Sequence, residues 1–217
     1  MAVDPLLKQA QGVWETLAAA PVSFPLVGGL NVVTSPASQM APPSWAGIVV
    51  LGESAIVTTP TDREAQVLRR ILAGMPTSSL TSSEAVRAVL PVHEVLGPAV
   101  LGYVSRDGFR PVPASRSVER LARGHQDLTA LVKSVSPEDA GESGMDEITS
   151  AAFVVRKGED VVAAAGFQVW SAAAAHLCVL TAAEERGRGL ARQVASRWAA
   201  HASQRQPLRE TSGPSPR

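Results

Sequence analysis

The chain has 217 residues, of which 45% are hydrophobic and 18% are charged, a composition that favours a folded globular protein over a disordered one. Lys plus Arg and Asp plus Glu number 20 each, so the formal net charge of +0 argues against a protein that wraps nucleic acid. The length suits two domains, since domains commonly contain about 100–150 residues.

The single cysteine, Cys178, excludes an internal disulfide framework and fits a reducing compartment. The residues after Met1 show no basic region followed by an apolar run. No apolar stretch reaches the about 20 residues that span a bilayer. We therefore expect a cytoplasmic protein with neither a membrane nor a nucleic acid as its partner.

The first half of the chain alternates helix and strand patterns. Asp4 and Pro5 are typical of a helix start, and apolar residues then recur at helical spacing to Leu17, before Pro21 ends the run. Thr61 and Glu64 form a capping box. The further elements expected in this half are one short strand within 21–43, a hairpin at 48–51 and 55–58, a helix at 61–72, a shorter helix after 81–84 and a strand at 95–104.

A domain boundary is expected in the loop-like residues 106–117, which contain Pro111 and Pro113. We divide the chain into an N-terminal α/β region of unknown role at 1–115, a core at 116–203 and a disordered polar tail at 204–217. The tail is Pro-rich and lacks apolar periodicity, so it cannot bury enough surface to become ordered.

The second half has sharper signals. The elements expected there are helices at 127–135 and from Ser136, strands at 152–156, 161–170 and 175–180, and a helix at 189–202. Residues 157–160 form the turn of a hairpin between the first two strands. On the last helix Leu190, Val194 and Trp198 recur every four residues and predict a buried stripe.

A basic, Gly-rich loop joins the last strand to the last helix, with the sequence Arg-Gly-Arg-Gly-Leu-Ala at residues 186–191. A helix start presents several unpaired N–H groups in one direction, and the helix dipole adds partial positive charge there. Gly187 and Gly189 allow the backbone to approach a ligand closely, and Arg186 and Arg188 can add charge-assisted hydrogen bonds. The loop therefore predicts a phosphate cradle, although an ordinary strand-to-helix connection with solvated arginines is the alternative.

Residues 177–181 and 186–191 together resemble the GNAT acyltransferase family. The family signature is Arg or Gln, two residues, Gly, one residue, then Gly or Ala, and Arg186, Gly189 and Ala191 occupy these places. The resemblance covers residues 127–201. It implies an α/β (α+β) fold with a GNAT-like mixed, mainly antiparallel sheet flanked by helices, here preceded by the extra N-terminal α/β region.

The resemblance also implies acetyl-CoA as the cosubstrate. The loop amides would hold its pyrophosphate, and the backbone of residues 178–180 would pair with its pantetheine arm. The implied cofactor-binding residues are Cys178, Val179, Leu180, Arg186, Gly187, Arg188, Gly189, Leu190 and Ala191.

This sequence departs from the family after the last helix. The resemblance implies a fifth strand, a fourth helix that often carries a Tyr as general acid, and a closing pair of strands. The chain instead continues into the polar residues 204–217, and its only tyrosine, Tyr103, lies far upstream. We therefore expect a chain that is truncated or frame-shifted relative to the family.

Three residues are candidates for chemistry. Glu147 precedes the hairpin and is the candidate catalytic base, because a carboxylate there could accept the amine proton directly or through water. A solvated helix-end carboxylate is the alternative. His176 is either a base or a surface histidine, and Cys178 is either a nucleophile or a small buried hydrophobe.

Other polar and aromatic residues have weaker patterns. Asp139 and Glu142 belong to an acidic run that could attract a cationic amine or could simply be solvated. Trp170 is expected in core packing or against the acceptor. No metal is expected, because the remaining histidines, His93, His125 and His201, lack the spacing of a metal site.

The function expected from these patterns is an N-acetyltransferase that moves an acetyl group from acetyl-CoA to a primary amine of a small molecule or peptide. A catalytically inactive acyl-CoA-binding or interaction module is the main alternative, and a fragment that folds poorly is a third. A second copy of the chain could complete the sheet, which leaves room for an oligomer.

Overall fold

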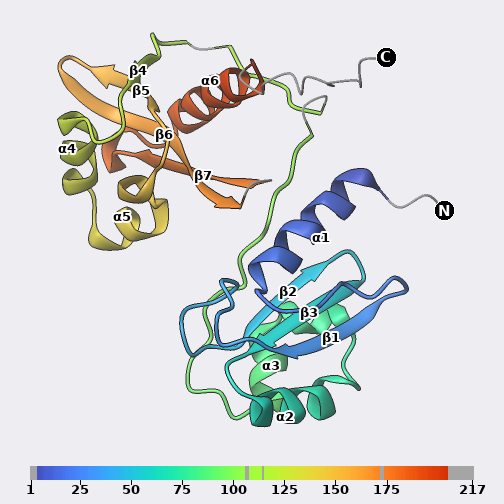
Figure 1. The fold of residues 1–217 in the computed structure, drawn as a ribbon. Coiled ribbons are helices and arrows are strands. Elements are labelled where there is room, and N and C mark those ends of the chain that lie inside the picture. The colour runs from blue at the N-terminus through green and yellow to red at the C-terminus, as the bar shows by residue number, and fades with distance from the viewer. Residues whose placement is uncertain (1–3, 106–107, 114, 172–173, 205–217) are drawn as a thin grey trace, which may run out of the picture. The chain divides into compact units, whose positions relative to one another are not determined.

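The computed structural model describes residues 4–105, 108–113, 115–171 and 174–204. The chain divides into two compact units, Met1–Ser105 and Arg106–Arg217. Both units combine helices with a sheet, and antiparallel pairing predominates, which confirms the predicted mixed α/β (α+β) class (Figure 1).

The first unit surrounds a three-stranded sheet of order β1-β3-β2, in which β1 is parallel and β2 antiparallel to β3. Every residue of β3 is buried, as expected for a central strand. Its elements in chain order are α1 (Pro5–Leu17), β1 (Gly29–Thr34), β2 (Gly47–Leu51), β3 (Ser54–Thr59), α2 (Asp62–Leu72), the 3₁₀ turn η1 (Thr77–Thr81) and α3 (Ser83–Val89).

Local sequence signals explain the helix starts of this unit. Asp4 caps α1 through its side chain, and Thr61 and Glu64 form the predicted capping box of α2. The third helix, α3, is capped by Ser82, whose hydroxyl accepts the N–H of Ala85. These elements confirm the predicted helices and hairpin of the first half.

The predicted strand at residues 95–104 is wrong. These residues form no regular structure, and the side chains of Val100 and Leu96 are 98% and 61% exposed. Apolar, β-branched residues form a strand only where a neighbouring strand and an apolar surface receive them. This segment has neither among the described residues.

The second unit contains a four-stranded antiparallel sheet of order β4-β5-β6-β7. Its elements are β4 (Glu119–Leu121), α4 (Gln126–Ser134), α5 (Pro137–Ser143), η2 (Met145–Glu147), β5 (Ala152–Lys157), β6 (Asp160–Ser171), β7 (Ala174–Thr181), η3 (Ala183–Glu185) and α6 (Leu190–Gln204). The helices and strands predicted for this half are all present, and β4 is an additional strand that we did not predict.

Two predicted boundaries need correction. The division between the units follows Ser105, earlier than the predicted boundary after residue 115. The reason is that Val112 and Ser115 bond to α6: Gln193 Oε1 accepts the N–H of Ser115 at 2.9 Å, and Ser196 Oγ accepts that of Val112 at 3.2 Å. Gln204, predicted to start the polar tail, is the last residue of α6, and the rest of that tail lies outside the described residues.

Helices cover both faces of this sheet (Figure 1). Gly166 of β6 faces Ile148, and a Cβ at Gly166 would lie 3.0 Å from two Ile148 side-chain carbons, so a larger residue there would require Ile148 to shift. The next residue, Phe167, packs against Trp198 of α6 with ring centroids 5.5 Å apart. Because successive strand residues alternate between faces, α4, α5 and η2 cover one face and α6 covers the other.

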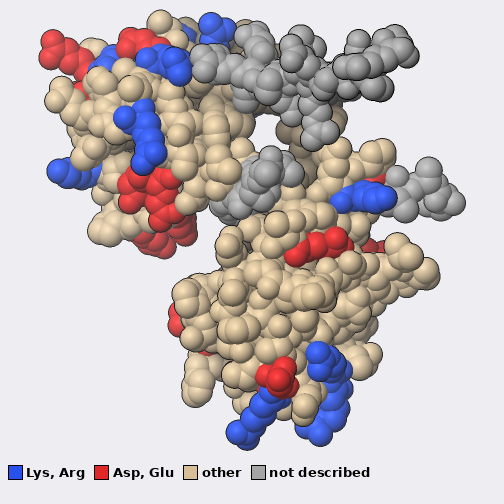
Figure 2. All heavy atoms as spheres, viewed as in Figure 1, with Lys and Arg blue, Asp and Glu red and all other residues tan. Residues whose placement is uncertain are grey.

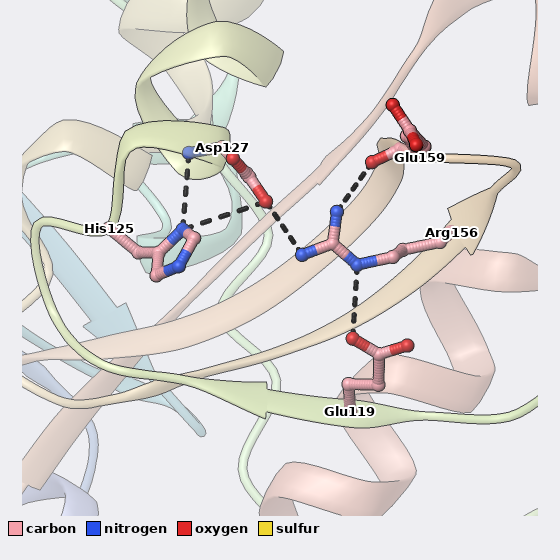
Figure 3. A network of polar contacts seen from close by, with 5 residues as sticks. All are labelled: Glu119, His125, Asp127, Arg156 and Glu159. Atoms are coloured by element: carbon pink, nitrogen blue, oxygen red, sulfur yellow. Dashed lines mark hydrogen bonds and ion pairs between the residues drawn. The ribbon is translucent and has the colours of Figure 1, made fainter.

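Arg156, near the end of β5, joins three elements of this unit (Figure 3). Its guanidinium lies 3.0 Å from Glu119 Oε2 on β4 and 2.6 Å from Asp127 Oδ2 in α4, and it donates to the Glu159 carbonyl at 2.5 Å. These carboxylates stabilise the charged form, so they raise the pKa of Arg156. His125 Nδ1 accepts the N–H of Asp127 and caps α4. The network fastens the short β4 and the start of α4 to the hairpin.

Candidate cofactor-binding site

The last strand, β7, leaves one edge of the sheet unpaired within the part of the chain that the structure describes. The Ala182 N–H donates to the Val162 carbonyl at 2.9 Å, in the register of the β6–β7 pair. Inter-strand hydrogen bonds alternate along an antiparallel strand. The backbone N–H and C=O groups of Leu177, Val179 and Thr181 therefore point away from β6, toward the open edge.

The loop between η3 and α6 presents free N–H groups at a helix start. Gly187 and Gly189 have φ angles of 76° and 74°, which L side chains rarely adopt. A Cβ at either glycine would meet no heavy atom within 4 Å, so the space beside the loop is open. Among the described residues, no acceptor takes the N–H of Gly187, Arg188 or Gly189. Such groups and the dipole of the 15-residue α6 favour an anion.

A cavity of about 360 Å³ lies beside the loop and the edge of β7. This volume falls within the roughly 300–1,000 Å³ range of small-molecule sites. The residues that line it are Asp139, Glu142, Ser143, Val179, Leu180, Thr181, Arg186 and Ala191. Thr181 Oγ1 is buried and has no hydrogen-bond partner among the described residues. A buried polar atom without a partner costs free energy, so this hydroxyl is available to a ligand or to water.

A larger cavity, of about 600 Å³, lies in the first unit. Its lining residues are Val27, Gly28, Gly29, Gly52, Glu53, Met75, Pro76, Thr77 and Ser78. The only ionisable side chain among them is the carboxylate of Glu53, so the lining offers no cation to a phosphate. The cavity of the second unit is therefore the candidate site for an anionic ligand, despite its smaller size.

At the cavity, the cationic side chain of Arg186 lies beside acidic side chains. Arg186 Nη2 lies 2.8 Å from Asp139 Oδ1, and Arg186 Nε donates to the Thr181 carbonyl at 3.3 Å. The Ser136 hydroxyl and then Arg186 lower the pKa of Asp139, because both hydrogen-bond to its charged form. Figure 2 shows acidic side chains gathered over α5, the helix that carries Asp139 and Glu142. The arrangement could hold a phosphate at Arg186 or a cationic amine at the acids.

Glu185, just before the loop, is a buried carboxylate with three cationic neighbours. Its side chain is 0% exposed, and its oxygens lie 2.6 Å from Lys157 Nζ, 3.0 Å from Arg188 Nη1 and 3.9 Å from Arg116 Nη1. The hydrogen bond from Lys157 is the largest of the effects that lower the pKa of Glu185. This carboxylate holds Arg188 of the loop to the β5–β6 turn and to the segment before β4.

The predicted residues of β7 differ in what they present to a ligand. Val179 and Leu180 line the cavity, whereas Cys178 is buried in the core. The hydrogen-bond alternation turns the backbone groups of Cys178 and Leu180 toward β6, so that only Val179 of these three offers its backbone to the open edge. Leu177 and Thr181, which we did not predict, share that property. Counting alternate residues from the end of the strand would have found them.

The predicted residues of the loop also divide by role. Arg186 and Ala191 line the cavity, Gly187 and Gly189 provide the open backbone, and Leu190 is buried beneath it. Arg188 forms an ion pair with Glu185, a residue that no sequence pattern indicated. No local pattern distinguishes Glu185 from its exposed neighbour Glu184, because its burial depends on residues distant in the sequence.

The candidate base lies toward the other end of β7. Glu147 is exposed, and its Oε2 accepts a hydrogen bond from Gln168 Nε2 at 3.0 Å. Gln168 pairs with His176, which lies four residues before Leu180 of the cavity. At about 3.4 Å per strand residue, this separation is roughly 13 Å. Glu147 therefore does not line the cavity.

The other chemical candidates have ordinary environments. Desolvation lowers the pKa of His176, so its imidazole is neutral near pH 7. Burial raises the pKa of the Cys178 thiol and outweighs a backbone hydrogen bond at Gln168 that lowers it, which disfavours a nucleophilic thiolate. The side chain of Trp170 lies outside the described residues, as does that of His201.

Comparisons of this chain with family models, with curated proteins and with solved structures find no match. In the part of the chain that the structure describes, no group of three or more His, Cys, Asp or Glu residues could hold a metal ion. Within the same residues, no helix combines the length and the apolar character that a membrane crossing requires.

Proposed function

We propose that the second unit binds acetyl-CoA and transfers its acetyl group to a primary amine. The observation that carries this proposal is a cavity lined by Arg186 and by residues of the open edge of β7, next to a loop whose N–H groups have no acceptor among the described residues. Free N–H groups and a guanidinium at a helix start suit a pyrophosphate. The resemblance to GNAT acyltransferases supports acetyl-CoA as the ligand that contains this pyrophosphate.

The open edge of β7 suits the amide-bearing pantetheine arm. An extended ligand can pair with a strand edge through main-chain hydrogen bonds, as an added strand does. From the loop the arm would run along β7 past Val179 to Leu177, whose backbone groups point outward. This direction leads from the cavity toward the end of β7 at which Glu147 and Gln168 lie. Glu147 is therefore distant from the phosphate cradle and close to the expected position of the thioester.

The proposed reaction is direct transfer without a covalent enzyme intermediate. The amine nitrogen attacks the thioester carbonyl carbon, the new C–N bond forms, and the C–S bond breaks with release of the CoA thiol. The amine proton passes to the Glu147 carboxylate, directly or through water, and the departing sulfur takes up a proton. The protein contributes mainly proximity and orientation, which can account for several kcal/mol of the barrier, on the order of 7–11 in well-oriented systems.

A second candidate is an acyl-CoA-binding module without catalytic activity. The position of the only tyrosine favours it, because GNAT enzymes often use a Tyr as general acid. Tyr103 belongs to the first unit, where its hydroxyl accepts a hydrogen bond from Trp14 Nε1. Binding of acetyl-CoA without turnover would support this second function.

Thiol release from acetyl-CoA in the presence of a panel of primary amines tests the transferase proposal. We expect amine-dependent release in the wild-type chain, and release reduced at least about tenfold in Glu147→Gln with acetyl-CoA affinity unchanged. Glu159→Gln is the matched control, because Glu159 is an exposed carboxylate in the β5–β6 turn. Saturable binding with no release for any amine would exclude the transferase and leave the binding module.

A further inference from the structure

Three cationic side chains surround the single negative charge of Glu185, so this group of residues has a net positive charge. Lys157, Arg116 and Arg188 come from three separate segments, and each makes its ion pair with Glu185 alone among the described residues. Three positive charges against one carboxylate leave an excess of two. Without Glu185 these cations would repel one another, so the buried carboxylate determines where they gather.

Most of the donors in this cluster remain free for a ligand. An ammonium group has three N–H donors and a guanidinium has five, and each contact with Glu185 occupies only part of them. The side chains of Lys157 and Arg188 are 60% and 51% exposed, so their remaining donors face solvent. The buried Glu185 carboxylate thus holds the cluster in place, and the exposed side of the cluster is accessible from solvent.

We propose that this cluster binds a phosphate monoester of the ligand, the 3′-phosphate that CoA carries and dephospho-CoA lacks. The inference rests on the proposed function. A phosphate monoester carries about −1.5 to −2 charges at pH 7, which matches the excess of two positive charges. Arg188 lies between Gly187 and Gly189, so it belongs both to the cradle and to the cluster. The two sites would therefore hold the pyrophosphate and the 3′-phosphate of the same molecule.

The cluster confers specificity for a ligand with three phosphates. The ratio of the affinities for CoA and dephospho-CoA measures this specificity. We expect the wild-type chain to bind CoA about fivefold more tightly than dephospho-CoA at low ionic strength, where partly exposed charges are weakly screened. Lys157→Met lowers this preference to about twofold or less and leaves the affinity for dephospho-CoA unchanged. Lys157→Arg keeps the preference, because it retains the charge.

Lys133→Met is the matched control, since Lys133 is exposed in the last turn of α4 and has no ion pair within the described residues. Circular dichroism establishes that each variant is folded. Equal affinity of the wild-type chain for the two cofactors would overturn the inference and leave the cradle intact. Preference retained in Lys157→Met would also overturn it. No binding of either cofactor by the folded chain would overturn both this inference and the proposed function.

Discussion

Asp139 and Arg186 form an ion pair at the cavity, with Oδ1 of the carboxylate 2.8 Å from Nη2 of the guanidinium. Asp139 lies in the first turn of α5, and Arg186 begins the loop before α6. The pair directs the Arg186 guanidinium toward α5. Under the proposed function, a phosphate at the loop would compete with Asp139 for this cation, and the strength of the pair would limit the affinity for the cofactor.

Removing the Asp139 charge should tighten cofactor binding. We expect Asp139→Asn to bind acetyl-CoA about threefold more tightly than the wild-type chain, because an amide releases the Arg186 guanidinium. The pKa of Asp139 is lowered from its usual 3.8, so the wild-type carboxylate is ionised throughout pH 5 to 8 and the gain in affinity should be constant over that range. Glu138→Gln removes a neighbouring exposed charge and should have no comparable effect. Weaker binding by Asp139→Asn would show that Asp139 does not compete.

Two substitutions at Gly189 distinguish the effect of added charge from the effect of backbone strain. Its φ of 74° imposes a cost of about 1–2 kcal/mol on any L side chain, although a Cβ meets no atom within 4 Å. Gly189→Ala should therefore lower stability and retain measurable binding of acetyl-CoA. Gly189→Glu should lose binding, because its carboxylate would lie where we propose that the phosphate binds. Calorimetric titration of the two variants checks this, and equal binding by both would contradict the assignment of the cradle.

Glu185 should make stability dependent on pH. Its pKa is lowered in the folded state, so its contribution is present above its ordinary value of 4.5 and is lost as pH falls through the folded-state pKa. We expect Glu185→Gln to unfold at a lower urea concentration than wild type at pH 7. The difference should shrink as the solution is acidified below pH 4.5. Glu184→Gln, at an exposed neighbour, should unfold at nearly the same urea concentration as wild type at any pH. If the difference between Glu185→Gln and wild type grows as the pH falls, Glu185 does not stabilise the fold in its charged form.

Arg156 should stabilise β4 and the start of α4 more than any other part of the unit. Arg156→Met removes its contacts with Glu119, Asp127 and the Glu159 carbonyl (Figure 3). Amide hydrogen exchange should then become faster in β4 and the first turn of α4. Arg120→Met, at an exposed arginine without an ion pair in the described residues, is the control. Exchange rates that are the same in both variants would show that the network has no stabilising role.

The parts of the fold that sequence patterns predicted well depend on local signals. The capping box of Thr61 and Glu64 places the start of α2 because both hydrogen bonds form within one turn. The turn at residues 157–160 likewise brings β5 and β6 together without help from distant residues. The loop glycines stand out in the sequence for a local reason as well, and the structure adds that both have positive φ, which glycine adopts without strain.

The parts that were missed depend on contacts between distant residues. Residues 95–104 have the composition of a strand but no partner strand among the described residues. Val112 and Ser115 join the second unit through hydrogen bonds to Ser196 and Gln193. The burial of Glu185 requires cations from the β5–β6 turn and from the segment before β4. The Arg186–Asp139 pair requires that α5 pack beside β7. A short stretch of sequence cannot reveal these contacts, because the residues that form them are far apart in the chain.

Calorimetric titration of the folded chain with acetyl-CoA tests the central claim most directly, with Gly189→Glu titrated in parallel. We predict saturable binding with a Kd in the micromolar range for the wild-type chain and none for the variant. Absence of binding by a wild-type chain shown to be folded would contradict the claim that the loop of residues 186–191 is a cofactor cradle.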